Sequence, residues 1–101
     1  MLVLSATTDR ITAQLAGSPV TELPMVVCYR DINTVDYTAG RQGIRTNGTT
    51  PVALVPSPAS GVQRVIDTIN IYNPNTGNVT VTITLDLNST LFPLYVYTLA
   101  M

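Results

Sequence analysis

Residues 79–87, with the sequence VTVTITLDL, alternate apolar and polar side chains without a break, and this pattern constrains the fold more than any other feature. A period of two predicts a β-strand with one face in a core and the other outside it. The apolar face is formed by Val79, Val81, Ile83 and Leu85. A second β-branched run precedes it, and the segment between them, Asn-Pro-Asn-Thr-Gly-Asn, is rich in turn-forming residues. We therefore expect a β-hairpin over residues 68–87.

The rest of the chain divides into further short strand patterns separated by turns. Predicted strands cover residues 10–17, 23–32, 35–38, 51–55, 62–73, 79–87 and 91–100, with residues 1–8 as an arm or edge strand. No window shows helical spacing of apolar residues. Strands at this spacing predict a single domain over residues 1–101, an all-β antiparallel sandwich of jelly-roll-like form with little or no helix.

Proline and glycine refine this assignment. Pro24 suits the first position of its strand, and Pro93 predicts that the last strand lies at an edge or carries a bulge. Residues 39–50 contain several glycines and predict a long surface loop with a tight turn at Asn47-Gly48. In the strand at 62–73, the alternation places Val65, Ile69 and Ile71 on one face and Ile66 and Tyr72 on the other.

The composition narrows the classes of function. Charged residues make up 11% of the 101 residues and the net charge is -1, whereas soluble domains usually contain about 25% charged residues. Such a chain has no electrostatic reason to bind nucleic acid or an anionic membrane. Low charge favours a subunit that covers its surface with copies of itself or with an assembly. Without a basic leader or a long apolar run, we expect a protein that is kept in a cytosol or leaves it by a route other than secretion.

The chain lacks the side chains of common catalytic and metal sites. It contains no histidine, which excludes Ser-His-Asp and Cys-His nucleophiles and histidine-bound metals. Cys28 lies in a strand pattern and is expected to be a buried, inert thiol. Asp31 and Asp36 are close in sequence but match no calcium loop, so we interpret them as solvated loop carboxylates. We expect no enzyme, no cofactor and no metal.

Six residues are candidates for contacts. Arg41 and Arg45, in the predicted loop, are either partner contacts or solvated side chains. Tyr95 and Tyr97 share one face of the last strand, where they form either stacked core rings or subunit contacts. Asp67 lies among isoleucines and needs a cationic partner if it is buried. A structural ion pair of Arg64 with Asp67 is the prediction, with Arg30 as the other candidate cation.

Several segments together resemble small virion structural proteins of tailed bacteriophages. The shared pattern is Leu-Pro-x-Val-Val-x-Tyr-x-Asp at 23–31, Tyr-Thr-x-Gly at 37–40, Thr-Asn-Gly-Thr-Thr at 46–50, Arg64, and Ile-Tyr-Asn at 71–73. The sequence SPAS at 57–60 departs slightly from the Ala-Pro form of that family. The resemblance implies a trimeric β-sandwich that binds other virion proteins, without an enzyme activity or cofactor. Family members extend further, so either the chain is truncated after residue 101, or its last strand pairs with a neighbouring chain or simply ends the fold.

Three functions follow as expectations. The first is a capsid decoration, or cement, protein that binds the major capsid protein as trimers, within virions assembled in the cytoplasm of a bacterial host. It would stabilise the shell by strand addition and apolar contacts. The second is a tail, baseplate or fibre-base adaptor. The third is a carbohydrate-binding module in which Tyr95 and Tyr97 form a platform for sugars.

Overall fold

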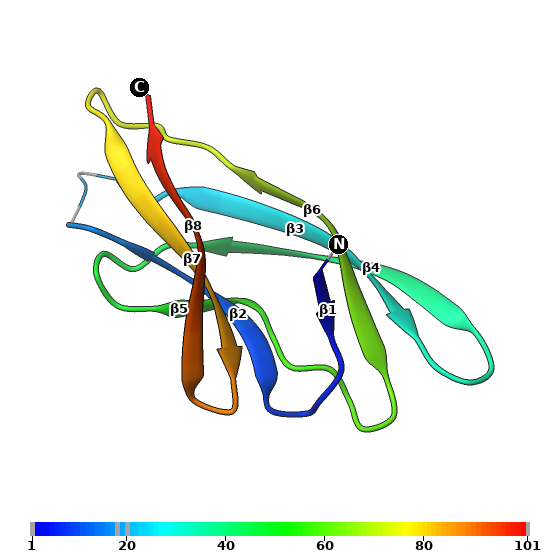
Figure 1. Cartoon of the computed structure of the whole chain (residues 1–101). Coiled ribbons are helices and arrows are strands. Elements are labelled where there is room, and N and C mark those ends of the chain that lie inside the picture. Colours follow the sequence, from blue (N-terminus) through cyan, green and yellow to red (C-terminus); the bar gives the residue numbers. More distant parts are fainter. Residues whose placement is uncertain (1, 18, 20, 101) are drawn as a thin grey trace.

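A computed structural model describes residues 2–17, 19 and 21–100, and within them it confirms an antiparallel all-β sandwich without a helix (Figure 1). The strands are β1 (Leu2–Leu4), β2 (Asp9–Leu15), β3 (Pro24–Ile32), β4 (Tyr37–Arg45), β5 (Val52–Val55), β6 (Gln63–Ile71), β7 (Val79–Leu87) and β8 (Thr90–Leu99). One sheet has the order β1-β6-β3-β4 and the other β5-β2-β7-β8. Ser18, in the predicted turn after β2, and Met101, the predicted truncation point, lie outside the described residues.

The core lies between the two sheets, as the alternation in residues 79–87 predicts. Val81 and Ile83 of β7 are buried in it, and Val79 and Leu85 pack against it. The facing sheet contributes Met25 and Val27 of β3, and β2 contributes Ile11, Ala13 and Leu15. The threonines of β7 point to the outer face of their sheet. The predicted division of this strand into two faces is confirmed.

Both predictions made from proline are confirmed. Pro24 is the first residue of β3. Strand β8 is the last strand of its sheet, and its register with β7 shifts where Ile83 pairs with Tyr95 and Thr84 pairs with Pro93. The turn before β8 is tight, with positive φ angles at Asn88 and Ser89, the backbone required by a type I′ hairpin. Within the described part of the N-terminal segment, Leu2–Leu4 form β1, a short edge strand beside β6.

The predicted hairpin over residues 68–87 is wrong, because β6 and β7 belong to different sheets. Residues 72–78 instead cross from one sheet to the other. Asn73 supports this crossing, since its side-chain nitrogen donates to the carbonyls of Gly77 (2.9 Å) and Leu99 (3.1 Å). A seven-residue connection is long enough to cover the roughly 10 Å between packed sheets, whereas hairpins favour two-residue turns.

The predicted loop at 39–50 is also wrong over its first half, which forms strand β4. This strand pairs with β3 from Tyr37 opposite Ile32 to Arg45 opposite Pro24. Gly40 lies under the ring of Tyr29, and a Cβ added at Gly40 would be 2.7 Å from Tyr29 Cε2. The glycine therefore admits an aromatic ring and does not mark a turn. The predicted tight turn follows at Asn47-Gly48, where Gly48 has a φ of 56°.

A bulge in β6 reverses part of the predicted face assignment. Ile66 pairs with Tyr29 and Thr68 pairs with Cys28, so Asp67 is an extra residue without a partner across the ladder. This insertion moves the residues before it to the opposite face. Val65 therefore lies on the outer face, whereas Ile66, Ile69 and Ile71 lie against the core. The prediction that Val65 shares a face with Ile69 is wrong.

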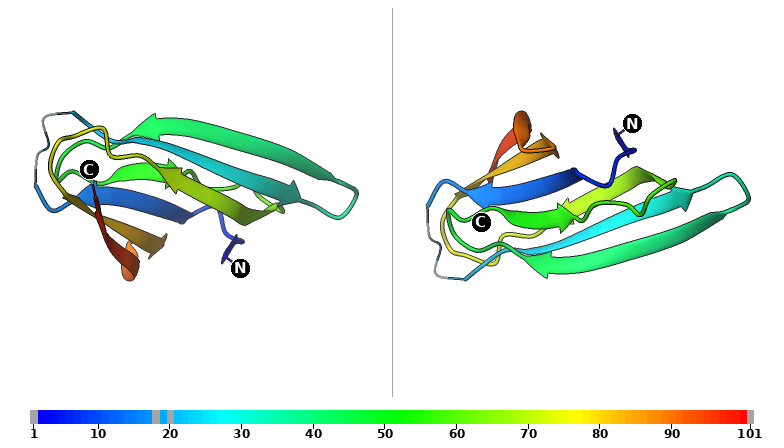
Figure 2. Two further views of the ribbon diagram at one scale, coloured as in Figure 1. Left: turned by 90° about the horizontal axis from the view of Figure 1, so that it is seen from above. Right: turned by 90° about the horizontal axis from the view of Figure 1, so that it is seen from below.

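Figure 2 shows the two layers of the sandwich edge-on. The β3–β4 hairpin extends past the other strands at one end, and the molecule is elongated, with a longest dimension of 47 Å. Strands β4 and β8 lie at opposite sides of the sandwich, because β4 ends one sheet near β5 and β8 ends the other near β6. These two edges carry the predicted contact residues.

Candidate functional site

Strand β8 concentrates the exposed apolar surface of the described chain. Five of its side chains are large, hydrophobic and exposed: Leu91, Phe92, Tyr95, Val96 and Tyr97. Val96 is 66% exposed and Leu91 is 62% exposed, both on the outer face of the sheet. No charged residue occurs between residues 87 and 100. A long apolar edge strand with no charge to protect it is a surface that natural proteins usually cover.

Tyr95 and Tyr97 form a stacked pair on the inner face of β8. Their ring centroids are 5.6 Å apart and their planes differ by 15°, and each ring is about half exposed. They line an open hollow together with Ile69, Ile71 and Leu99. The other wall of this hollow is β6. Its residues 67–71 have no strand on the edge away from β3, because β1 pairs only with residues 64–66. Two free backbone edges therefore flank one apolar hollow.

Arg41 and Arg45 lie on the other side of the molecule, on strand β4 instead of in a loop. They face outward from β4, opposite Cys28 and Pro24. The three ion pairs of the described residues join Arg10 to Asp86, Arg30 to Asp67 and Arg64 to Asp31, and they include neither Arg41 nor Arg45. The structure therefore separates the predicted contact arginines from the predicted contact tyrosines.

The predicted ion pair of Arg64 with Asp67 is not formed. Asp67, in the bulge, faces outward and pairs with Arg30 at 3.0 Å. Arg64 faces inward and binds Asp31 with two hydrogen bonds, of 2.8 Å from Nε and 3.0 Å from Nη2. The bulge explains the difference, because it separates the faces on which Arg64 and Asp67 lie. The other candidate cation, Arg30, is the partner of Asp67.

Arg64 is the most extensively bound charged side chain of the described residues. Besides its two bonds to Asp31, Nη1 donates to the carbonyl of Pro56 at 2.8 Å, and the guanidinium lies 4.4 Å from the ring centroid of Tyr29. The hydrogen bond with Asp31 raises the pKa of Arg64, while burial acts to lower it. This arrangement joins β3, β6 and the segment after β5. Its role is therefore structural.

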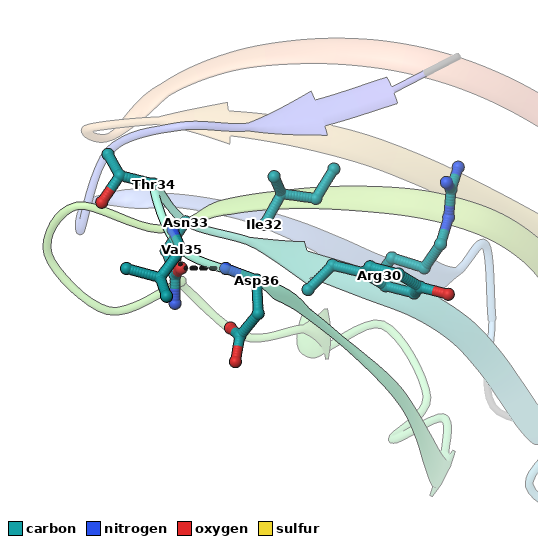
Figure 3. A pocket seen from close by; sticks show the side chains of 7 residues that line it. Arg30, Ile32, Asn33, Thr34, Val35 and Asp36 are labelled. Atoms are coloured by element: carbon teal, nitrogen blue, oxygen red, sulfur yellow. Dashed lines mark hydrogen bonds between the residues drawn. The ribbon is translucent and has the colours of Figure 1, made fainter.

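Asp31 and Asp36, both predicted to be solvated loop carboxylates, lie in different surroundings. Asp31 lies in β3 and is bound by Arg64, so that interpretation is wrong for Asp31. Asp36 lies in the turn between β3 and β4, where its backbone N–H donates to Asn33 Oδ1 at 2.9 Å (Figure 3). A shallow hollow surrounds this turn, and Arg30 points away from the carboxylate of Asp36 (Figure 3). The hollow holds no pair of groups suited to acid–base chemistry.

Cys28 is not a core residue, contrary to the prediction. It is partly exposed on the outer face of β3, opposite Arg41 on one side and Thr68 on the other. The side chains of Met25 and Val27 occupy the core positions of this strand. The bulge at Asp67 of β6 lies opposite Cys28 and Tyr29 and leaves the alternation of β3 unchanged, so Cys28 stays on the outer face.

Two acidic residues have structural roles that the sequence did not suggest. Glu22 Oε1 accepts bonds from Thr46 Oγ1 and from the backbone N–H of Gly48, both at 2.8 Å. Asp9 Oδ2 accepts bonds from the backbone N–H groups of Ser5 and Ala6. Glu22 joins segments that are distant in sequence, whereas Asp9 closes a local turn. Only Asp9, at a strand start after a Ser/Thr-rich segment, had a local signal for such a turn.

Several residues of the segments 23–31, 37–40 and 46–50 gather in the structure around Arg64 and the start of β3. Tyr29 lies over Gly40 and under Arg64, and Arg64 binds Asp31. Thr46 contacts the start of the same pattern, because its Oγ1 accepts the N–H of Leu23 at 2.9 Å. The pattern therefore contains residues that hold the sandwich together. None of these contacts forms a binding site.

No family model matches this chain, and neither the curated proteins nor the solved structures give a match. The described residues contain no group of three side chains able to hold a metal ion. Among those residues there is also no helix long and apolar enough to cross a membrane.

Proposed function

We propose that this chain is a non-enzymatic structural subunit of a bacteriophage virion, in which it decorates the capsid and stabilises the shell. The observation that carries the proposal is strand β8, a free edge with five exposed large apolar side chains and no charge. Such an edge can add strands and bury apolar surface against neighbouring proteins. The net charge of -1 also suits a subunit that is packed closely among others.

The resemblance to virion proteins of tailed bacteriophages indicates the kind of particle. The contacts made by the matching residues give a structural reason for the pattern on which that resemblance rests. Tyr29, Asp31, Gly40 and Arg64 form one cluster that joins β3, β4 and β6. A pattern of this kind preserves a scaffold, which agrees with a family of structural subunits. Within the particle, the protein would bind the major capsid protein, and assembly would take place in the cytoplasm of a bacterial host.

Quantitative mass spectrometry of purified virions tests this proposal. A decoration protein is expected at hundreds of copies per particle, because it covers a shell of repeated capsomers and gains affinity through many contacts. A few to some tens of copies would instead support a tail, baseplate or fibre-base adaptor. Absence from virions would overturn both assignments.

A further inference from the structure

We propose that strand β4 is a docking site for an extended acidic segment of a partner protein, which adds to the sheet as a further strand and binds Arg41 and Arg45 through two carboxylates. The segment recognised in this way has acidic residues at two positions four apart and an uncharged side chain midway between them. The inference goes beyond the proposed function, which rests on β8, and it can be tested on the purified chain.

Strand β4 has a free and well-ordered backbone edge. It is the last strand of its sheet, has nine residues and contains no proline. Its register with β3 is regular from Tyr37 to Arg45. Gln42 anchors it from the inner face, because Nε2 donates to the carbonyls of Ala53 (3.2 Å) and Leu54 (3.1 Å) in β5. The edge therefore loses little conformational freedom when a partner strand pairs with it.

The two arginines set the charge and the spacing of the partner segment. Arg41 and Arg45 lie on the outer face of β4 and are both exposed. Residues four apart in a strand are separated by about 13 Å. A strand paired beside β4 has the same repeat, so two of its residues four apart lie opposite the two arginines, about 5 Å away across the ladder. Carboxylates at those positions would form charge-assisted bonds with the guanidinium groups.

The described chain does not supply these carboxylates itself. Acidic side chains that already accept hydrogen bonds from other groups are Asp9, Glu22, Asp31, Asp67 and Asp86. Asp67 lines the same small hollow as Arg41, but Arg30 binds it at 3.0 Å. The remaining acid, Asp36, lies in the turn before β4. The outer face of β4 therefore keeps an excess of positive charge, although the whole chain has a net charge of -1.

Gly43 leaves a gap between the two arginines. It lies on the same outer face, opposite Val26 of β3, which is 42% exposed. A Cβ added at Gly43 would meet only the carbonyl of Met25, at 4.0 Å, and Gly43 is not among the glycines with a positive φ. Neither packing nor backbone geometry therefore requires glycine here. Glycine inside a strand often marks the close approach of another backbone, and the gap beside Val26 can accept the middle side chain of the bound segment.

A second copy of this chain is a poor occupant of the site. In an antiparallel pair of β4 strands centred on Gly43, Arg41 of each copy would lie opposite Arg45 of the other, and like charges in that position destabilise the pair. Pairing with the uncharged β8 of another copy would leave both guanidinium groups without a counter-ion. Arginines can also serve only to protect an edge from pairing. A purely protective role predicts no preference for an acidic strand.

Two synthetic peptides test the site by NMR titration of isotope-labelled protein. The first, Thr-Glu-Thr-Leu-Thr-Glu-Thr, has its glutamates four residues apart and the same side-chain order in both directions, so it suits a parallel or an antiparallel strand. The second, Thr-Glu-Thr-Leu-Glu-Thr-Thr, has the same composition but places its glutamates on opposite faces. The first should shift amide signals of β4 with a Kd on the order of 1 mM. The second should bind about threefold more weakly, because it loses one exposed ion pair.

Variants of the protein locate the contact. Arg41→Ser combined with Arg45→Ser should weaken binding of the first peptide about tenfold and remove its advantage over the second. Gly43→Val should also weaken binding, because the new side chain fills the gap beside Val26 while valine suits a strand. Thr82→Asp is the control, since it changes the net charge by one unit on the outer face of the other sheet, and its Kd should stay within about twofold of the unchanged protein. Circular dichroism should show the same all-β spectrum for every variant.

Four results would overturn the inference. They are no shift of β4 signals at about 5 mM of the first peptide, equal binding of the two peptides, shifts confined to β8, and unchanged binding by the double arginine variant. The last result would mean that the arginines only protect the edge. None of these results affects the number of copies in virions, which tests the proposed function.

Discussion

Arg64 shows at the scale of one residue how a chain with few charges uses them. Its guanidinium forms two bonds with Asp31, one with Pro56 and a stacking contact with Tyr29. Its side chain is only 12% exposed. A planar group with several fixed donors can make all these contacts at once, and a lysine cannot.

Replacement of Arg64 should therefore be costly. Arg64→Met is expected to lower the free energy of unfolding by about 2–3 kcal/mol, because Asp31 and the Pro56 carbonyl lose charge-assisted bonds. Arg64→Lys should recover less than half of this loss. Urea denaturation measures both. Since the pKa of Arg64 is raised, its contribution is present at neutral pH and is lost only in strongly alkaline solution. Equal stability of Arg64→Lys and the unchanged protein would contradict the role given to the guanidinium.

Gly40 depends on the same cluster. Gly40→Ala should destabilise the protein by about 1–3 kcal/mol, because the new Cβ would be 2.7 Å from the ring of Tyr29, which Arg64 holds in place. Gly43→Ala is the control on the same strand, since its nearest neighbour would be a carbonyl at 4.0 Å. That variant should be neutral or slightly stabilised. Similar melting temperatures of the two variants would show that Tyr29 moves aside freely.

Among the elements, β7 makes the most direct connection between sequence and fold. Ile83 is 2% exposed and lies in the core, whereas Thr82 faces outward opposite Gln14 and Val96. Ile83→Asp should prevent folding, because an unpaired buried carboxylate costs several kcal/mol out of a total stability of about 5–15 kcal/mol. Thr82→Asp should fold and remain soluble. Circular dichroism of the soluble fractions distinguishes the two. Folded Ile83→Asp protein would show that the faces are reversed.

Sequence patterns predicted the elements whose local chemistry agrees with their environment. Three predictions are confirmed: the alternation of β7, Pro24 at the start of β3, and Pro93 at a bulge in an edge strand. Each of them depends only on neighbouring residues in the sequence. Strand β4 was missed because Gly40 makes room for the ring of Tyr29, a residue outside the local pattern, and does not mark a turn. The face of Val65 was missed because the Asp67 bulge is set by pairing with β3. Short-range periodicity contains no information about such partners.

The candidate surface was predictable in part for the same reason. Tyr95 and Tyr97 are two residues apart in a strand, so their shared face follows from the period of two. Their exposure depends on β8 being the last strand in its sheet and on β1 ending before residue 67 of β6. Both facts belong to the arrangement of the sheets. Arg41 and Arg45, predicted to lie in a loop, belong to strand β4 and face outward from it.

The whole molecule is built from pairings between distant segments. Strand β1 pairs with β6 and β2 pairs with β7, and both sheets remain incomplete until the second half of the chain has joined them. Closing such large loops before contacts form slows folding. We therefore expect refolding in milliseconds to seconds, measured by stopped-flow tyrosine fluorescence at low protein concentration. Refolding in microseconds would contradict this account and would point to a nucleus made of local hairpins.

The projecting β3–β4 hairpin makes this sandwich suitable as a scaffold for displaying peptides. Its turn is closed by Asn33, which accepts the N–H groups of Val35 and Asp36 and donates its own N–H to the carbonyl of Asp36. Lengthening a surface loop costs only about 0.6 kcal/mol for each doubling of its length. An insert between Thr34 and Val35 would therefore stand at the tip of the long axis, away from the core and from strand β8 (Figure 2). Copies arranged on a repeating surface would present that insert as a regular array.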